Sequence, residues 1–261
     1  MKICAAVVLY NKSCRDSLTC QTLLRFGAKA INPLILDNST RELGNAAFCE
    51  AQGWRYLNMG GNTGLSKAYN RALELFRTEN VDLVVWADDD TVFPEVYAST
   101  LETAAKAHPE AMVFLPVVMS GETIVSPALY GKYHIARTPS IEALSGRELT
   151  AINSGMAVRL SAYDNYRYPE EMFLDYLDHD FMRYCREKHF PVFVLRNTVL
   201  KQSFFADSRP NRSDALRRRK LFEKDFRIYS KACGCFPPIT ALQLLKGRIR
   251  MELTCTRKGK Q

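Results

Sequence analysis

The stretch DLVVWADDD, residues 82–90, decides the fold. Its apolar part, Asp82–Ala87, is typical of a strand that is buried on both faces of a sheet. Three carboxylates follow directly, Asp88, Asp89 and Asp90. Adjacent carboxylates repel one another unless a cation compensates their charge, and hard divalent cations take oxygen ligands. The stretch therefore predicts a buried strand with a metal-binding cluster at its carboxyl end.

A helix N-cap is the alternative interpretation of this cluster. Asp90 or Thr91 would cap a helix that begins near Pro94. One aspartate is enough for a cap, whereas three are present, so we favour the metal site.

Outward from this strand, apolar runs alternate with helical patterns. Further strands are expected at residues 2–10, 32–37, 54–58 and 111–118. Helices are expected at residues 16–27, 65–78 and 94–107. This alternation predicts an α/β fold in which a mostly parallel sheet is flanked by helices. Ligands of such sheets bind at the carboxyl ends of the strands.

Polar clusters follow three of the other strands at these ends. They are Tyr10-Asn11, Asp37-Asn38 and Gly60–Gly64. The glycine cluster opens a helix, which suits phosphate or ribose contact, although a tight turn with positive φ would also need glycines. Asp37-Asn38 suits contact with a base or ribose, or a simple turn. Because all these clusters fall at one edge of the expected sheet, they predict a ligand site there.

The second half of the chain is less regular. Loops and short strands are expected over residues 119–150, with strands over 152–159 and 192–195. From about residue 207 the chain becomes basic and helical, with a break at 233–238. Residues 239–253 carry apolar side chains at helical spacing, with lysine and arginine on other faces. This part of the sequence predicts a helical C-terminal extension.

The segment FLDYLDHDF supplies candidate acid–base groups. It contains Asp175, Asp178 and Asp180, and a helix is expected to follow it. Asp178 and Asp180 are not one helical turn apart, so one can face a cleft as a general base while the other makes a structural contact. A charged helix N-terminus, stabilised by the helix dipole, is the alternative. His179 is expected to be solvent-facing or structural.

The composition is that of an ordinary globular protein. Hydrophobic residues make up 47% of the 261 residues, and no apolar run reaches the roughly 20 residues of a membrane-spanning helix. The eight cysteines are scattered without C-x-x-C spacing, and no cleavable signal peptide precedes the first strand. We therefore expect free thiols, a reducing compartment and a cytoplasmic location.

Together, these motifs resemble the family 2 glycosyltransferases of the GT-A fold, most closely the bacterial rhamnosyltransferase-like branch. The matching segments occur in the family order: VVLYN (7–11), LDNST (36–40), GNTGLSKAYN (61–70), WADDD (86–90), NSGMAVR (153–159) and FLDYLDHDF (173–181). The resemblance implies a Rossmann-like GT-A catalytic domain over residues 1–205, followed by a basic helical region over residues 206–261.

The resemblance also implies roles for individual residues. Those that would hold the nucleotide of the donor are Tyr10, Asn11, Asp37, Asn62, Asp88 and Asp89. Asp88 and Asp90 would bind Mn²⁺ or Mg²⁺, Ser154-Gly155 would shape the acceptor side, and Asp178 would be the catalytic base. The implied reaction is inverting transfer of a sugar, rhamnose or another deoxyhexose or hexose, from a nucleotide-diphosphate donor. The implied acceptor is a glycan, lipid-linked, in bacterial surface polysaccharide synthesis.

One departure from the family concerns the metal. Many relatives place a histidine after the last core strand, whereas the segment VLKQSFF has Gln202 there, with Lys201 beside it. The departure weakens the expectation of tight metal coordination, and Lys201 would partly compensate by contacting phosphate.

The charge of the chain suggests a further contact. The net charge is +8, and basic residues are concentrated from Arg209 to the C-terminus. Under the glycosyltransferase interpretation, this region would contact the anionic inner face of the plasma membrane. The alternative is a helix that packs on the core and leaves its basic residues in solvent.

Two other functions are less well supported by the sequence. A sugar-phosphate nucleotidyltransferase of similar fold usually carries a glycine-rich loop after the first strand, and LYNKSCRD has no glycine. A nucleic-acid binder would leave the six core motifs unexplained, and the basic tail lacks interleaved aromatic residues. No nucleic-acid partner is therefore expected.

Overall fold

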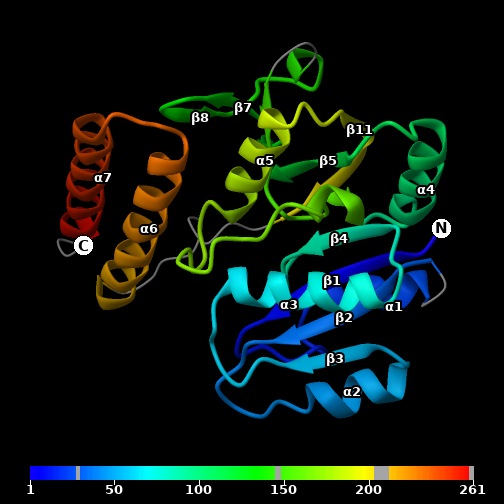
Figure 1. The fold of residues 1–261 in the computed structure, drawn as a ribbon. Helices are drawn as coiled ribbons and strands as arrows, with labels where there is room; N and C mark the ends of the chain where they lie inside the picture. Colours follow the sequence, from blue (N-terminus) through cyan, green and yellow to red (C-terminus); the bar gives the residue numbers. More distant parts are fainter. Residues whose placement is uncertain (28–29, 145–147, 203–211, 259–261) are drawn as a thin grey trace.

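The computed structural model describes residues 1–27, 30–144, 148–202 and 212–258 (Figure 1). Its centre is an eight-stranded sheet of order β11-β5-β10-β4-β1-β2-β3, in which β6 also pairs with β5. The strands are β1 (Ile3–Leu9), β2 (Asn32–Asp37), β3 (Arg55–Asn58), β4 (Leu83–Ala87), β5 (Val113–Ser120), β6 (Thr123–Ser126), β10 (Ala157–Arg159) and β11 (Val192–Lys201). Parallel pairs join β1 to β2 and β4, β2 to β3, and β5 to β11. The predicted mostly parallel sheet is confirmed.

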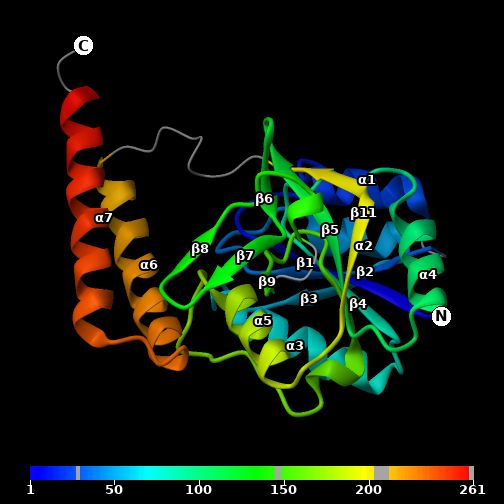
Figure 2. The ribbon, with the colours of Figure 1, turned by 90° about the horizontal axis from the view of Figure 1, so that it is seen from above.

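Helices cover both faces of the sheet (Figures 1 and 2). They are α1 (Leu18–Phe26), α2 (Asn45–Gln52), α3 (Leu65–Thr78), α4 (Tyr97–Ala107) and α5 (Leu177–Glu187). Tyr69 and Phe76 of α3 and Phe181 of α5 belong to one core cluster. Leu23 of α1 and Leu101 of α4 belong to a second cluster. The sheet therefore has an apolar layer on each side.

Strand β4 lies between these two layers. All its residues are buried, with Val84 and Trp86 in one core cluster and the other three in the second cluster. A strand covered on both faces has to be apolar throughout, which is the pattern of LVVWA. Where the strand ends, the chain leaves the core, and Asp88 is the first residue at the carboxyl edge of the sheet.

Several element boundaries differ from the sequence predictions. Helix α2 was not predicted, because it is short, lies between Gly44 and Gly53, and buries only Asn45 and Cys49. Helix α4 begins three residues after Pro94, at Tyr97. In the segment 152–159, β10 occupies only the last three residues and runs antiparallel to β4 and β5. Strand β11 extends well beyond residue 195, through a register shift.

The C-terminal region consists of two long helices beside the sheet, α6 (Arg212–Ala232) and α7 (Pro237–Lys258) (Figure 2). A small sheet of β7 (Ala128–Gly131), β8 (His134–Ala136) and β9 (Leu149–Thr150) reaches toward them. The side chain of Gln243 donates a hydrogen bond to the carbonyl of Tyr133, and Cys235 Sγ donates to the carbonyl of Lys132 (3.0 Å). The C-terminal region therefore contacts the small sheet through these hydrogen bonds. Arg209 and Lys260, part of the predicted basic region, lie outside the described residues.

The seven described cysteines are free thiols, and five of them are buried. Within the described residues, each helix is too short or too polar to span a membrane.

Candidate active site

The three carboxylates after β4 lie together at the carboxyl edge of the sheet. Asp88 Oδ2 accepts hydrogen bonds from Ser154 Oγ (2.7 Å) and Gln202 Nε2 (2.9 Å). The same Gln202 nitrogen donates to Asp90 Oδ1 (3.2 Å). Burial, with repulsion from Asp88 and Asp89, raises the pKa of Asp90 to about 6. Burial also raises the pKa of Asp88. The pair is therefore crowded with negative charge, and its two oxygens converge on one atom.

The helix-cap interpretation of this cluster is wrong. Val96 occupies the N-cap position of α4, so neither Asp90 nor Thr91 caps the helix. The backbone N–H of Thr91 instead bonds Thr19 Oγ1 (2.9 Å) in α1. Ser17 Oγ, at the start of the same helix, donates to the carbonyl of Asp89 (2.7 Å). The acidic loop is thus held in place by α1, and its side chains are left to face the cavity.

The acidic run of residues 175–180 splits between cavity and core. Asp178 lines a cavity of about 900 Å³ that is also lined by Asp88, Asp89 and Asp90. Asp180 is fully buried and accepts hydrogen bonds from Tyr166 Oη and Arg183 Nε, both at 2.9 Å. Both aspartates lie in the first turn of α5, which begins at Leu177. The run therefore places one carboxylate in the cavity and uses the other as a structural contact.

The loop before α5 has a defined shape. Tyr176 adopts a left-handed conformation, with φ of 64°, as the N-cap residue of the helix. His179 Nδ1 lies 2.7 Å from Thr150 Oγ1 of β9 and its side chain is mostly buried. His179 therefore makes a structural contact, and it also lines the cavity of Asp178.

A second cavity, of about 520 Å³, lies next to the first. Of these two, the first is called the larger cavity and the second the smaller cavity. Tyr10, Asn38, Asn62 and Gly64 line it, and they come from the predicted polar clusters after β1, β2 and β3. An added Cβ on Gly64, whose φ is +89°, would come within 2.9 Å of the carbonyl oxygen of Phe173. Gly64 is therefore required for the close approach of the 173–175 loop to this cavity.

Two of the predicted nucleotide contacts have other partners in the structure. Asp37 Oδ2 accepts hydrogen bonds from Asn45 Nδ2 (2.9 Å) and Tyr56 Oη (3.1 Å). Asn11 Oδ1 accepts from the backbone N–H of Thr40 (3.0 Å). Both side chains shape the loops below the smaller cavity. Ser154 is fully buried against Asp88, and its neighbour Asn153 lines the larger cavity in its place.

Helix α6 forms one wall of both cavities, which the sequence did not predict. Arg218 lines both of them, and it pairs with Asp175 through Nη2 and Oδ1 (2.6 Å). Asp225, which is fully buried, accepts hydrogen bonds from three successive backbone N–H groups, those of Phe173, Leu174 and Asp175 (2.8–2.9 Å). The ring of Tyr176 stacks on Tyr229 of the same helix, with centroids 4.9 Å apart. Helix α6 thus fixes the loop that leads to Asp178.

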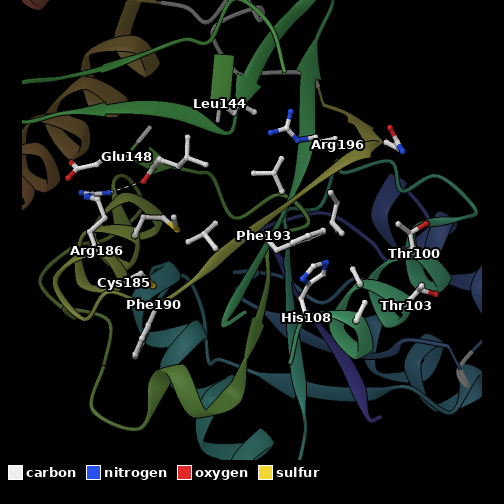
Figure 3. A pocket seen from close by; sticks show the side chains of 18 of the residues that line it. Thr100, Thr103, His108, Leu144, Glu148, Cys185, Arg186, Phe190, Phe193 and Arg196 are labelled. Atoms are coloured by element: carbon white, nitrogen blue, oxygen red, sulfur yellow. Dashed lines mark hydrogen bonds between the residues drawn. The ribbon is translucent and has the colours of Figure 1, made fainter. Parts of the chain in front are cut away.

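A third cavity, of about 1080 Å³, lies away from these residues. It is bounded by α4, the C-terminal part of α5 and the outer edge of β11 (Figure 3). Its lining is mostly apolar, with His108, Glu148, Arg186 and Arg196 among the polar residues. Most of the predicted site residues line the first two cavities, namely Tyr10, Asn62, Asp88, Asp89, Asp90 and Asp178, so we place the candidate active site there.

Comparisons with known proteins bear on the family and the fold of the chain. A family model described as Glycosyl transferase family 2 matches residues 33–167, just over half of the chain. A search of curated proteins found no match. Among solved structures, TarS (residues 1–349) of S. aureus is similar with a TM-score of 0.58 and 15% identity, over 89% of this chain and 65% of that one. The chain therefore spans less than two thirds of TarS.

Two further structures were solved with nucleotide sugars. The mannosyltransferase PcManGT from Pyrobaculum calidifontis, in complex with GDP-Man and Mn²⁺, has a TM-score of 0.57 at 12% identity and is matched over 93% of this chain and 69% of that one. TarS in complex with UDP-GlcNAc has a TM-score of 0.54 at 13% identity, over 87% of this chain and 66% of that one. At such low identities the likeness concerns the fold, and it confirms the predicted GT-A architecture.

Proposed function

The chain belongs to glycosyl transferase family 2, and on this premise we propose that it transfers a sugar, with inversion, from a nucleotide-diphosphate donor to a hydroxyl group of a glycan. One observation carries the proposal: Asp178 and Asp88–Asp90, far apart in the sequence, line one cavity. A carboxylate beside an acidic cluster at the carboxyl edge of an α/β sheet is the arrangement that this transfer needs.

In the proposed reaction, Asp178 acts as the general base. Its Oδ1 accepts a hydrogen bond from the backbone N–H of His179 (2.7 Å), and its other oxygen takes the proton of the acceptor hydroxyl. The acceptor oxygen forms a bond to the anomeric carbon while the bond from that carbon to the diphosphate breaks. The nucleoside diphosphate leaves with the bonding electrons. The anomeric carbon passes through an oxocarbenium-like transition state, which the carboxylates of the cavity stabilise.

We propose that the donor nucleoside lies in the smaller cavity. Tyr10 is half-exposed there and offers a ring for stacking, and Asn38 and Asn62 offer amide groups for a base or ribose. Asp37 and Asn11 would act by shaping the loops beneath this cavity. The sugar would then extend toward Asn153 and Asp178 in the larger cavity.

The residues present fit a divalent cation at Asp88 and Asp90. Their oxygens converge on Gln202 Nε2, and Gln202 Oε1 is buried without a hydrogen-bond partner. Within the described part of the chain, no group of three or more His, Cys, Asp and Glu side chains is arranged to hold a metal ion. The proposed donor set is therefore two carboxylates and the amide oxygen, an all-oxygen set that suits Mg²⁺ or Mn²⁺. When bound, the ion would stabilise the charge of the leaving diphosphate.

Replacing Gln202 with histidine should tighten Mn²⁺ binding about 10-fold. The amide nitrogen of Gln202 now donates to both carboxylates and has to move before a cation can bind, whereas imidazole supplies a lone pair at that place. Isothermal titration of the donor-free protein with Mn²⁺ measures the change. Gln202→Ala removes the amide without adding a ligand, so equal affinities of the two variants would contradict the role of position 202 in metal binding.

A donor screen tests the proposed function. Thermal unfolding is followed with UDP-, GDP- and dTDP-sugars, each with Mn²⁺ and with a chelator. A donor that raises the melting temperature identifies the nucleotide. We propose rhamnose, or another deoxyhexose or hexose, as the sugar, on the basis of the motif order in the sequence. If none of the donors stabilises the protein or is turned over, the proposal fails. If protection is unchanged by the chelator, the metal role fails.

We further propose a lipid-linked glycan as the acceptor, in bacterial surface polysaccharide synthesis, and a peripheral contact with the anionic inner face of the plasma membrane. Helix α7 exposes Ile239, Leu242, Leu245 and Ile249 at helical spacing, together with Lys246. An exposed apolar stripe flanked by cations suits the interface of an anionic bilayer. This would give the extension of the chain a role in delivering the enzyme to its acceptor.

Vesicle binding checks this contact. We expect the protein to sediment with phosphatidylglycerol vesicles and not with phosphatidylcholine vesicles. The double change Leu242→Glu and Leu245→Glu should lower the bound fraction about 10-fold or more, because two apolar side chains no longer enter the bilayer. Val96→Glu, at a similarly exposed apolar position on the sheet domain, is the matched control. Sedimentation of the double variant at the wild-type level would refute the membrane contact.

A further inference from the structure

The two cavities of the site meet at one cationic side chain, and from this we infer that Arg218 of α6 binds the diphosphate of the donor. The inference rests on the proposed function, because it requires a ligand with its nucleoside in the smaller cavity and its sugar near Asp178. Arg218 lies outside the segment that matches the family model, residues 33–167. Its assignment comes from its position between the cavities.

The boundary between the cavities is defined by the residues that line both. They are Tyr10, Leu65, Asp88, Asp89, Leu174 and Arg218. In a nucleotide sugar the diphosphate joins the nucleoside to the sugar, so it has to cross this boundary. Among these six residues, which are all described, Arg218 is the one that carries positive charge. The diphosphate would therefore pass close to its guanidinium group.

The charge of the larger cavity favours such a contact. Its carboxylates are Asp88, Asp89, Asp90, Asp175 and Asp178. The described arginine side chains that line it are Arg137 and Arg218. A diphosphate adds further negative charge to a surface that already has more carboxylates than cations, so cationic partners are needed to hold it. Guanidinium groups bind phosphate through two parallel hydrogen bonds, which gives both charge and orientation.

Asp175 is the partner of Arg218 in the structure. The pair is bidentate, with Nη2 bound to Oδ1 (2.6 Å) and Nη1 bound to Oδ2. The Arg218 side chain is 31% exposed, so a ligand in the cavity can reach it. Asp225 fixes the backbone of Asp175 through its N–H group (2.9 Å). A phosphate presents two oxygens as a carboxylate does, and it can take the place of Asp175 while the loop stays held by Asp225.

A purely structural clamp between α6 and the loop is the competing explanation of the pair. The two explanations differ in what happens when each partner is changed. If Arg218 and Asp175 form only a clamp, either change weakens the site in the same direction. If Arg218 is the diphosphate ligand and Asp175 its competitor, the two changes act in opposite directions on diphosphate binding.

Isothermal titration with a nucleoside, its monophosphate and its diphosphate tests the assignment. The probes are the uridine, guanosine and thymidine series, and the series that binds wild-type protein most tightly is used for the variants. We expect Arg218→Ala to weaken diphosphate binding about 10- to 100-fold and to leave nucleoside binding unchanged. We expect Asp175→Asn to tighten diphosphate binding, because it removes the competing carboxylate. Arg218→Lys should be intermediate, since it keeps the charge and loses the fork.

The controls separate this inference from the proposed function and from loss of folding. Arg227→Ala removes an exposed arginine from the same helix and should bind as wild type does. Melting curves of each variant, with unchanged nucleoside affinity, show that the site is still formed. If wild-type protein binds diphosphate and the Arg218→Ala variant binds it equally well, the assignment of Arg218 is overturned while the proposed function stands. The same holds if Asp175→Asn weakens diphosphate binding as Arg218→Ala does. If wild-type protein binds no nucleoside diphosphate, the proposed function falls and the assignment falls with it.

Discussion

Replacing Asp178 with asparagine should lower the rate of sugar transfer about 100- to 10,000-fold. Asparagine keeps the shape of the side chain but cannot take the proton of the acceptor hydroxyl, and general-base catalysis contributes a factor of this size. The loss should fall on kcat, because Asp178 does not lie at the boundary where the diphosphate crosses. Initial rates with the donor identified by the screen, at saturating acceptor, measure the effect.

Two controls make this result specific to the base. The affinity of the Asp178→Asn variant for the nucleoside diphosphate should stay within about twofold of wild type, since the change is remote from the nucleotide. Asp164→Asn changes an exposed aspartate outside the site and should leave the rate unchanged. A kcat of the Asp178→Asn variant near the wild-type value would mean that another group accepts the proton.

Replacing Asp225 with alanine should lower the free energy of unfolding by about 3 kcal/mol or more. Its carboxylate is fully buried and accepts hydrogen bonds from three backbone N–H groups, all of which would lose their partner. A fully buried donor without a partner costs about 1–3 kcal/mol, and these three donors are partly buried, so each is expected to cost about 1 kcal/mol. Urea-induced unfolding followed by circular dichroism measures the change.

The same substitution should also reduce transfer, although Asp225 is buried behind the loop. The loop from Phe173 to Asp175 leads directly into the helix that carries Asp178, so its displacement moves the base. Asp225→Asn keeps one carbonyl oxygen as an acceptor and should lose less stability and less activity than Asp225→Ala. Lys224→Ala, at the exposed position just before Asp225, should change stability by less than about 0.5 kcal/mol. A fully stable Asp225→Ala protein would contradict the role of Asp225 in fixing the loop.

The sheet domain could be predicted from local patterns because its strands are continuous apolar runs. Strand β4 is the clearest case, since its five residues serve two apolar layers and no polar residue interrupts it. The position of the candidate site at the carboxyl edge of the sheet could be predicted from the same patterns, because the polar clusters follow the ends of strands. The separation of Asp178 from Asp180 could also be anticipated, since neighbouring helical positions point in different directions.

The wall formed by α6 could not be predicted in this way. The contacts between Asp225 and the loop join residues about fifty positions apart, and hydrophobic periodicity carries no information on such pairs. A weak signal is present in the sequence: Phe222, Phe226 and Tyr229 fall on one side of a basic helix, with Asp225 among them. An acidic residue inside an aromatic stripe indicates a buried partner, but not which partner. The short helix α2 was missed for a different reason, because its small amphipathic face is shorter than the usual pattern.

The position of Asp225 has a consequence for the order in which the protein is made. Helix α6, which holds residues 173–175 in place, follows the strands of the sheet domain and the proposed base Asp178 in the chain, so it is synthesised after them. A nascent chain that ends before residue 212 therefore has the strands and the acidic cluster. It lacks the three hydrogen bonds from Asp225 that hold residues 173–175. Assembly of the candidate site is thus delayed until α6 has been synthesised.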